Sequence, residues 1–161
     1  MSVSTLLETD YKNVWDWVYN ELSFKPSTRS IDWPSIQTSR NSIKFKIDFL
    51  WGSGYSELVY FNFIQHAIEV FMAITLPGEE VYALDWQHEC FYFDPRKLNA
   101  QDMLDDGSSA TKISFIPDGD YYIFITKDFE NVWFGHPWER TITIIGDKLI
   151  TSIKENGFFN K

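Results

Sequence analysis

The spacing of apolar and polar residues in the first half of the chain predicts a helix, a strand and a second, longer helix. Apolar side chains recur at helical spacing over residues 10–22 and again over residues 55–75. Between them, residues 42–49 alternate between apolar and polar side chains, as in a strand with one buried face. Thr9 or Asp10 is expected to cap the first helix, and Pro77-Gly78 to end the second.

The second half predicts short strands joined by tight turns, followed by a last short helix over residues 148–155. Residues 97–111 are polar and predict an exposed loop with a helical turn near residues 100–104. The strands are expected at residues 81–86, 89–93, 113–116, 120–126, 132–134 and 141–145.

Short connections between successive strands favour antiparallel pairing. We therefore expect an α+β fold, with a mainly antiparallel sheet of about five to seven strands and two main helices packed on one face. The length favours a single domain over residues 1–161.

Charge narrows the classes of partner. The formal net charge is −9 and the isoelectric point is near 4.7. A nucleic-acid backbone or an anionic membrane would be repelled, so neither is an expected partner. A basic protein or a small cationic ligand suits this charge, although solubility alone also explains it. The chain begins without a basic, apolar leader and has no apolar run of about 18 residues, so we expect a cytoplasmic protein.

Aromatic residues make up 18% of the chain. Most of these rings are expected in the core, and any that remain exposed would form a binding face. Cys90 is the only cysteine, and the aromatic residues that follow it predict a buried, unreactive thiol.

Two segments, residues 83–89 and 135–140, each place an indole, an imidazole and a carboxylate within a few positions. We expect them to meet on one surface of the sheet. The candidate ligand- or partner-binding residues are Trp86, His88, Asp120, His136, Trp138 and Glu139.

A functional and a structural role are possible for each of the two histidines, and the sequence favours them differently. His88 is a candidate general base or ligand, with Asp85 or Glu89 to orient it, but a hydrogen-bonded residue at a strand end is favoured. If the strand stays extended, Trp86 and His88 share one face. His136 precedes a proline and is held extended, which serves recognition and the closing of a hairpin equally well.

The sequence indicates no cofactor and no metal. A zinc site built from His88, His136 and a carboxylate would lack any motif spacing, and Asp118 and Asp120 are too few ligands for a calcium loop. Walker A, G-x-G-x-x-G and G-x-S-x-G motifs are absent. No catalytic residue can be assigned, and an enzyme is the less favoured interpretation.

Three strings carry a family resemblance: residues 82–88 (YALDWQH), 117–124 (PDGDYYIF) and 134–139, which contain GHPWE. They resemble an uncharacterised family of small bacterial proteins known as a domain of unknown function. The resemblance implies a stand-alone bacterial cytoplasmic protein with no assigned activity, and it carries over no catalytic residue.

Two functions remain open. The favoured one is a binding module that uses an acidic, aromatic-rich face to hold a protein or ligand, by analogy with immunity or inhibitor proteins that bind basic toxins. The alternative is a small enzyme or small-molecule-binding domain with a pocket of histidine, carboxylate and tryptophan side chains. The sequence leaves open the identity of the partner, the oligomeric state, the strand order and whether the 97–111 loop closes over the site.

Overall fold

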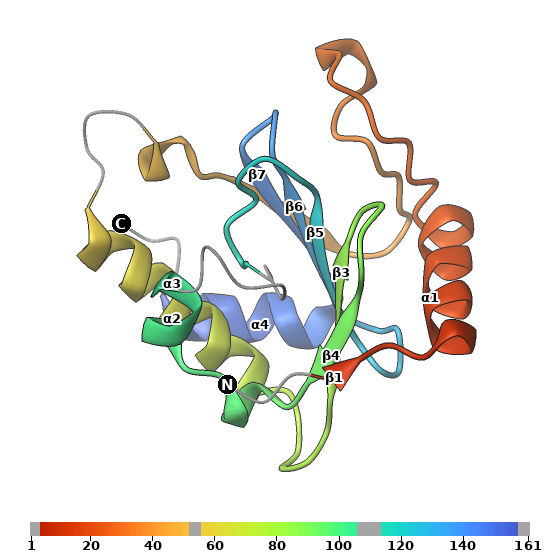
Figure 1. The fold of residues 1–161 in the computed structure, drawn as a ribbon. Coiled ribbons are helices and arrows are strands. Elements are labelled where there is room, and N and C mark those ends of the chain that lie inside the picture. Colours follow the sequence, from red (N-terminus) through yellow and green to blue (C-terminus); the bar gives the residue numbers. More distant parts are fainter. Residues whose placement is uncertain (1–3, 52–55, 106–113, 158–161) are drawn as a thin grey trace.

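In the computed structural model, which describes residues 4–51, 56–105 and 114–157, an antiparallel sheet lies between two layers of helices (Figure 1). Among the described residues the sheet has seven strands in the order β1-β4-β3-β5-β6-β7-β2. The strands are β1 (Ser4–Thr5), β2 (Ser42–Lys46), β3 (Val81–Asp85), β4 (Phe91–Phe93), β5 (Tyr122–Thr126), β6 (Val132–His136) and β7 (Thr141–Ile145). The expected α+β class and antiparallel sheet are confirmed.

Four α-helices and three short 3₁₀ helices accompany the strands in the described part of the chain. The α-helices are α1 (Glu8–Glu21), α2 (Glu57–Met72), α3 (Ala100–Asp105) and α4 (Asp147–Asn156). The 3₁₀ helices are η1 (Ser30–Asp32), η2 (Asp48–Leu50) and η3 (Pro95–Lys97). None of the described helices combines the length and the apolar character that crossing a membrane requires.

The central strands β5, β6 and β7 are buried at every position. Side chains alternate across a strand, so each of these strands contributes to two cores. Phe124 and Trp133 belong to the core under α2 and α4, whereas Ile123 and Phe134 belong to the core under α1. A strand that is covered on both faces needs apolar residues at successive positions, as these strands have.

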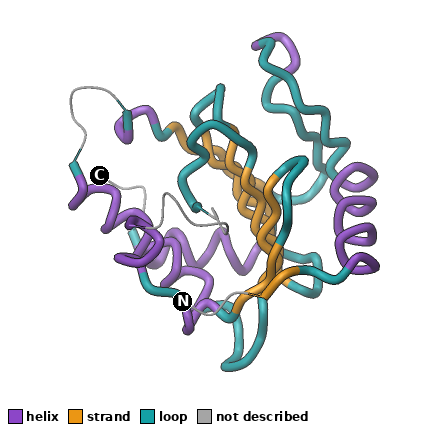
Figure 2. The backbone as a smooth tube through the Cα atoms, in the orientation of Figure 1, coloured by secondary structure: helices purple, strands orange, loops and turns teal. Residues whose placement is uncertain are grey.

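The two main helices lie on opposite faces of the sheet, and not on one face as the sequence suggested. Val14, Trp15 and Val18 of α1 pack on one face, and α2 and α4 cover the other (Figures 1 and 2). The physical reason is the apolar character of β5–β7 on both sides, because one layer of helices would have left half of that surface in water.

Most element boundaries agree with the sequence pattern, but two predicted strands differ. The strand expected over residues 42–49 ends at Lys46, because residues 48–50 form the 3₁₀ helix η2. The expected strand at residues 113–116 is wrong where the structure describes it, because residues 114–116 bend and bury Phe115 and Ile116 under α2. Phe115 stacks on Phe124 with ring centroids 4.3 Å apart. Residue 113, the start of the second predicted helix at Tyr55 and residues 106–111 of the polar loop lie outside the described residues.

Candidate functional site

A turn at the end of β3 brings Asp85 and His88 together. The His88 N–H donates a hydrogen bond to the Asp85 carbonyl at 3.1 Å, and Gln87 adopts a positive φ of 67° between them. As a result, His88 Nδ1 lies 3.1 Å from Asp85 Oδ1. The strand does not stay extended as far as His88: it ends at Asp85 and the next residues turn, so Trp86 and His88 do not share a strand face.

Asp120 joins this pair from the neighbouring strand. Asp85 faces Tyr122 in the antiparallel register of β3 and β5, so the residues that precede β5 lie beside the turn. Asp120 Oδ2 is 3.1 Å from His88 Nδ1. The ligand-type atoms of these three residues, which we call the Asp85–His88–Asp120 cluster, all lie within 4.8 Å of one another.

The cluster is at the surface, but its two carboxylates are drawn back from water. The Asp85 and Asp120 side chains are 16% and 18% exposed, whereas His88 is 64% exposed. Burial, followed by the neighbouring Asp120 carboxylate, raises the pKa of Asp85 to about 7. The hydrogen bond to Asp85 raises the pKa of His88. The cluster therefore favours a positive charge beside the two carboxylates.

Aromatic side chains pack next to the turn that carries Asp85 and His88. The Trp86 indole N–H donates to the Tyr19 hydroxyl at 3.2 Å, and the Tyr11 hydroxyl donates to the His88 carbonyl at 3.4 Å. The fully buried Tyr121 ring lies 5.9 Å from Trp86 and 5.3 Å from Trp138 between centroids. Both predicted segments thus contact Tyr121, a residue that was not among the candidates.

His136 lies in the interior and not at the cluster. It is fully buried, and its Nδ1 accepts a hydrogen bond from the Glu139 N–H at 3.0 Å. Its Nε2, which then carries the proton, donates to Ser35 Oγ at 3.0 Å. Burial lowers the pKa of His136 to about 4, so the ring is neutral at pH 7. Both nitrogens are used inside the protein.

The loop between α1 and β2 covers His136. Ser35 contacts both the Tyr121 hydroxyl, at 3.2 Å, and His136, and the Trp33 ring lies 5.1 Å from the imidazole. The sequence indicated a loop there from its prolines and hydroxyl residues. It contained no local signal that this loop would seal a buried hydrogen-bond network.

Glu139 is bound within the protein. Its carboxylate accepts a hydrogen bond from the Thr141 hydroxyl at 2.6 Å and pairs with Lys44 at 3.2 Å. The guanidinium of Arg140 lies 4.9 Å from the centre of the Trp51 ring. Lys44 is distant in sequence, but pairing of β2 with β7 places it next to this segment.

Cys90 is buried, as expected, and its thiol supports the turn. Its Sγ donates to the carbonyls of Asp85 and His88 at 3.7 and 3.6 Å. Burial raises the pKa of the thiol to about 11, so it is not a thiolate at neutral pH.

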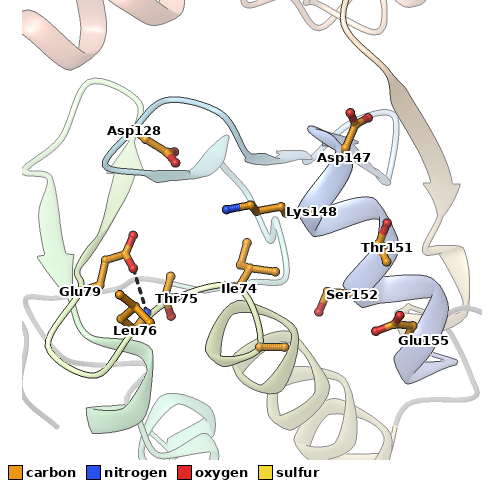
Figure 3. Close-up of a pocket in the computed structure, with 11 residues that line it drawn as sticks. Ile74, Thr75, Leu76, Glu79, Asp128, Asp147, Lys148, Thr151, Ser152 and Glu155 are labelled. Atoms are coloured by element: carbon orange, nitrogen blue, oxygen red, sulfur yellow. Dashed lines mark hydrogen bonds between the residues drawn. The ribbon is translucent and has the colours of Figure 1, made fainter.

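A cavity of about 720 Å³ opens at the other end of the central strands (Figure 3). Val81, at the start of β3, faces Thr126, at the end of β5, so the turns next to these residues lie away from Asp85. The cavity is bounded by the segment after α2, the β5–β6 turn and α4. We call it the acidic cleft, because its charged lining residues are the four carboxylates Glu79, Asp128, Asp147 and Glu155 and one lysine, Lys148.

Internal hydrogen bonds hold three of these carboxylates in place. Glu79 accepts from the Leu76 N–H at 2.8 Å, which is the dashed line in Figure 3. Asp147 accepts from the Asn41 amide at 2.8 Å, and Asp128 accepts from the Glu130 N–H at 3.0 Å. A neighbouring cavity of about 490 Å³ shares Asp128, Asp147 and Lys148, so the charged surface extends beyond the cleft. None of the sequence-based candidates lines either cavity.

Comparison with known proteins gives the family but no activity. The family model described as "Protein of unknown function (DUF2716)" matches residues 5–150. The chain belongs to this family. A relative of this DUF2716 chain, the uncharacterized protein YxiI of Bacillus subtilis (strain 168), is 35% identical over 86 residues. That match covers 53% of the chain, which spans about half (51%) of the length of YxiI. No solved structure matches the chain.

Proposed function

We propose that this DUF2716 protein is a binding module that holds a basic protein partner in its acidic cleft. The observation that carries the proposal is the cavity of about 720 Å³, whose charged lining consists of four carboxylates and one lysine. The whole chain carries a net charge of −9, which would attract a basic partner over longer distances.

The cleft also offers apolar surface beside its charges. Ile74 and Leu76 line it, and Leu76 is 73% exposed. A lysine or arginine of a partner could lay its aliphatic stem on these residues while its charged end meets a carboxylate. This combination distinguishes the cleft from a uniformly charged surface that serves solubility alone.

Aromatic residues contribute less to this surface than the sequence suggested. Most described rings pack within the two cores, and the large aromatic side chains that are strongly exposed are Tyr19, Phe49 and Trp138. None of these three lines the cleft. The proposed partner surface is therefore acidic and concave, and the aromatic residues mainly stabilise the fold.

In the inhibitor-like version of this proposal, the protein covers the basic active or binding site of a toxin or enzyme. Its support is charge complementarity, since a partner that binds RNA, DNA or another polyanion presents a basic surface. An acidic cleft would compete for that surface, and opposite charges would speed the encounter.

Removing two cleft carboxylates should weaken the binding of a basic ligand. We expect a fluorescent decalysine peptide to bind the wild-type chain in low salt and to dissociate in about 0.5 M salt. The Glu79→Gln/Glu155→Gln double variant should bind the peptide about ten-fold more weakly, because two attractive charges are lost. Fluorescence anisotropy measures both affinities.

The matched control changes the net charge equally on the opposite face. Glu8→Gln/Glu21→Gln removes two exposed carboxylates at the ends of α1 and should change the affinity by less than about two-fold. Equal weakening in both double variants would show that the peptide responds only to net charge, and the proposal would then be wrong.

A second candidate function is favoured by a separate observation. His88 and two carboxylates converge at the surface, as a small ligand-binding or catalytic site requires. His136 and Glu139, which were expected to share this site, are engaged elsewhere in the protein. Any such site would consist of the Asp85–His88–Asp120 cluster and its aromatic neighbours.

A further inference from the structure

The Asp85–His88–Asp120 cluster has the donor atoms and spacing of a metal centre. His88 Nδ1 is 3.1 Å from one oxygen of each carboxylate, and the three atoms lie within 4.8 Å of one another. An ion about 2.1 Å from two donors that are 3.1 Å apart would see them at an angle of about 95°. That angle suits adjacent donors around an octahedral ion, so His88 Nδ1 could share one ion with either carboxylate oxygen.

We infer that Asp85, His88 and Asp120 bind one divalent first-row transition-metal ion, of the Mn²⁺ or Zn²⁺ type. One imidazole nitrogen and two carboxylate oxygens suit these ions, whereas Ca²⁺ and Mg²⁺ prefer oxygen ligands alone. This site is independent of the acidic cleft, because it involves different residues at the other end of the strands.

Contacts outside the cluster hold the three ligands in position. The Tyr121 N–H donates to Asp120 Oδ1 at 2.8 Å, which leaves Oδ2 directed at His88. The Cys90 thiol donates to the backbone carbonyls of Asp85 and His88, and the Tyr11 hydroxyl also donates to the His88 carbonyl. Such supporting hydrogen bonds orient ligands and contribute to affinity in metal sites.

The charge and exposure of the cluster also favour an ion. Two carboxylates that are largely withdrawn from water repel one another, and a divalent cation between them would compensate both charges. The exposed His88 forms the outer side of the cluster, so coordination positions on that side would remain open to water or to a ligand.

Calorimetric titration of the full chain with Mn²⁺, and separately with Zn²⁺, at about pH 7.5 tests the inference. We expect one ion per chain. His88→Gln and Asp120→Asn should each weaken binding at least about ten-fold, because each removes one of three ligands. Circular dichroism and thermal melting without metal check that both variants fold. Asp120→Asn is expected to fold, since it removes one of two repelling carboxylates.

The matched control is His66→Gln, which removes another imidazole, whose Nδ1 lies 3.6 Å from the Glu69 carboxylate on α2. This variant should bind the ion as the wild type does. The inference is overturned if neither ion binds, if His88→Gln binds as tightly as the wild type, or if only His66→Gln loses the ion.

Discussion

Replacing Gly146 with alanine is expected to destabilise the protein by about 3–5 kcal/mol. Gly146 has a φ of 107°, a conformation that residues with a side chain rarely adopt. A Cβ atom there would collide with the Glu130 carbonyl and lie 2.6 Å from Asn131 Oδ1. Asn131 Oδ1 accepts the Leu149 N–H in the first turn of α4, so the collision would also disturb that helix.

Gly78→Ala is the matched control for this substitution. Gly78 also has a positive φ, 86°, but a Cβ atom there would meet nothing within 4 Å. It should cost about 1 kcal/mol, which is the backbone strain alone. Equilibrium unfolding in urea compares the two variants. If Gly146→Ala lowers the free energy of unfolding no more than Gly78→Ala does, Gly146 does not lie in close contact with Glu130 and Asn131 of the β5–β6 turn.

Acid should destabilise the protein through His136, by about 2–3 kcal/mol between about pH 7.5 and 4.5. The pKa of His136 is lowered to about 4 in the folded protein, and the ordinary value for histidine is 6.5. As the pH falls through this interval, His136 becomes protonated in the unfolded chain but remains largely neutral in the folded protein. The stability contributed by the neutral ring is therefore complete above the unfolded pKa and is lost on acidification.

Burial is the main cause of this shift, and two charged groups modify it. Glu139 raises the pKa of His136, whereas Lys44 lowers it. Ser35 in the covering loop and Tyr121, the residue before β5, contribute hydroxyl groups near the ring. A neutral Nε2–H donor suits the Ser35 oxygen, so protonation on Nδ1 would break the hydrogen bond from Glu139 without gaining another.

Urea unfolding of wild type and His136→Gln at several pH values isolates this effect. Other groups titrate in the same interval, but their contributions cancel in the difference between the two proteins. The stability advantage of the wild type should shrink by about 2–3 kcal/mol on acidification. Parallel curves for wild type and His136→Gln would contradict a buried neutral ring.

The sequence predicted most elements of the fold because their signals are local. Helical spacing marked α1 and α2, and β-branched or aromatic runs marked β3, β5 and β7. The two-residue strand β1 has no periodicity to detect. The placement of α1 and α2 on opposite faces depends on the apolar side chains that β5–β7 carry on both faces of the sheet. Which helix covers which face is decided only when the sheet is assembled.

The candidate site was partly predictable for the same reason. His88 and Asp120 were identified from residue type, and Asp85 was considered as a partner of His88. Pairing of β3 with β5 brings Asp120 next to that turn. The turn itself was missed because Trp86-Gln87 contains no glycine, proline or asparagine, although Gln87 adopts a positive φ.

The acidic cleft could not be found from the sequence. Its carboxylates come from a turn after α2, a hairpin turn and two ends of α4, and no motif links them. Each is an ordinary exposed acidic residue when taken alone. Only the packing of α4 beside the β5–β6 turn, which depends on Gly146, makes them the walls of one cavity.

Mapping the bound decalysine peptide by NMR would test the proposed function most directly. Backbone amide shifts of the isotope-labelled full chain would be followed as the peptide is added. We expect the largest changes in residues 73–79, at Asp128 and along residues 147–155, which line the cleft. Changes centred on Asp85 and Asp120, or spread evenly over the acidic surface, would contradict the assignment of partner binding to the cleft.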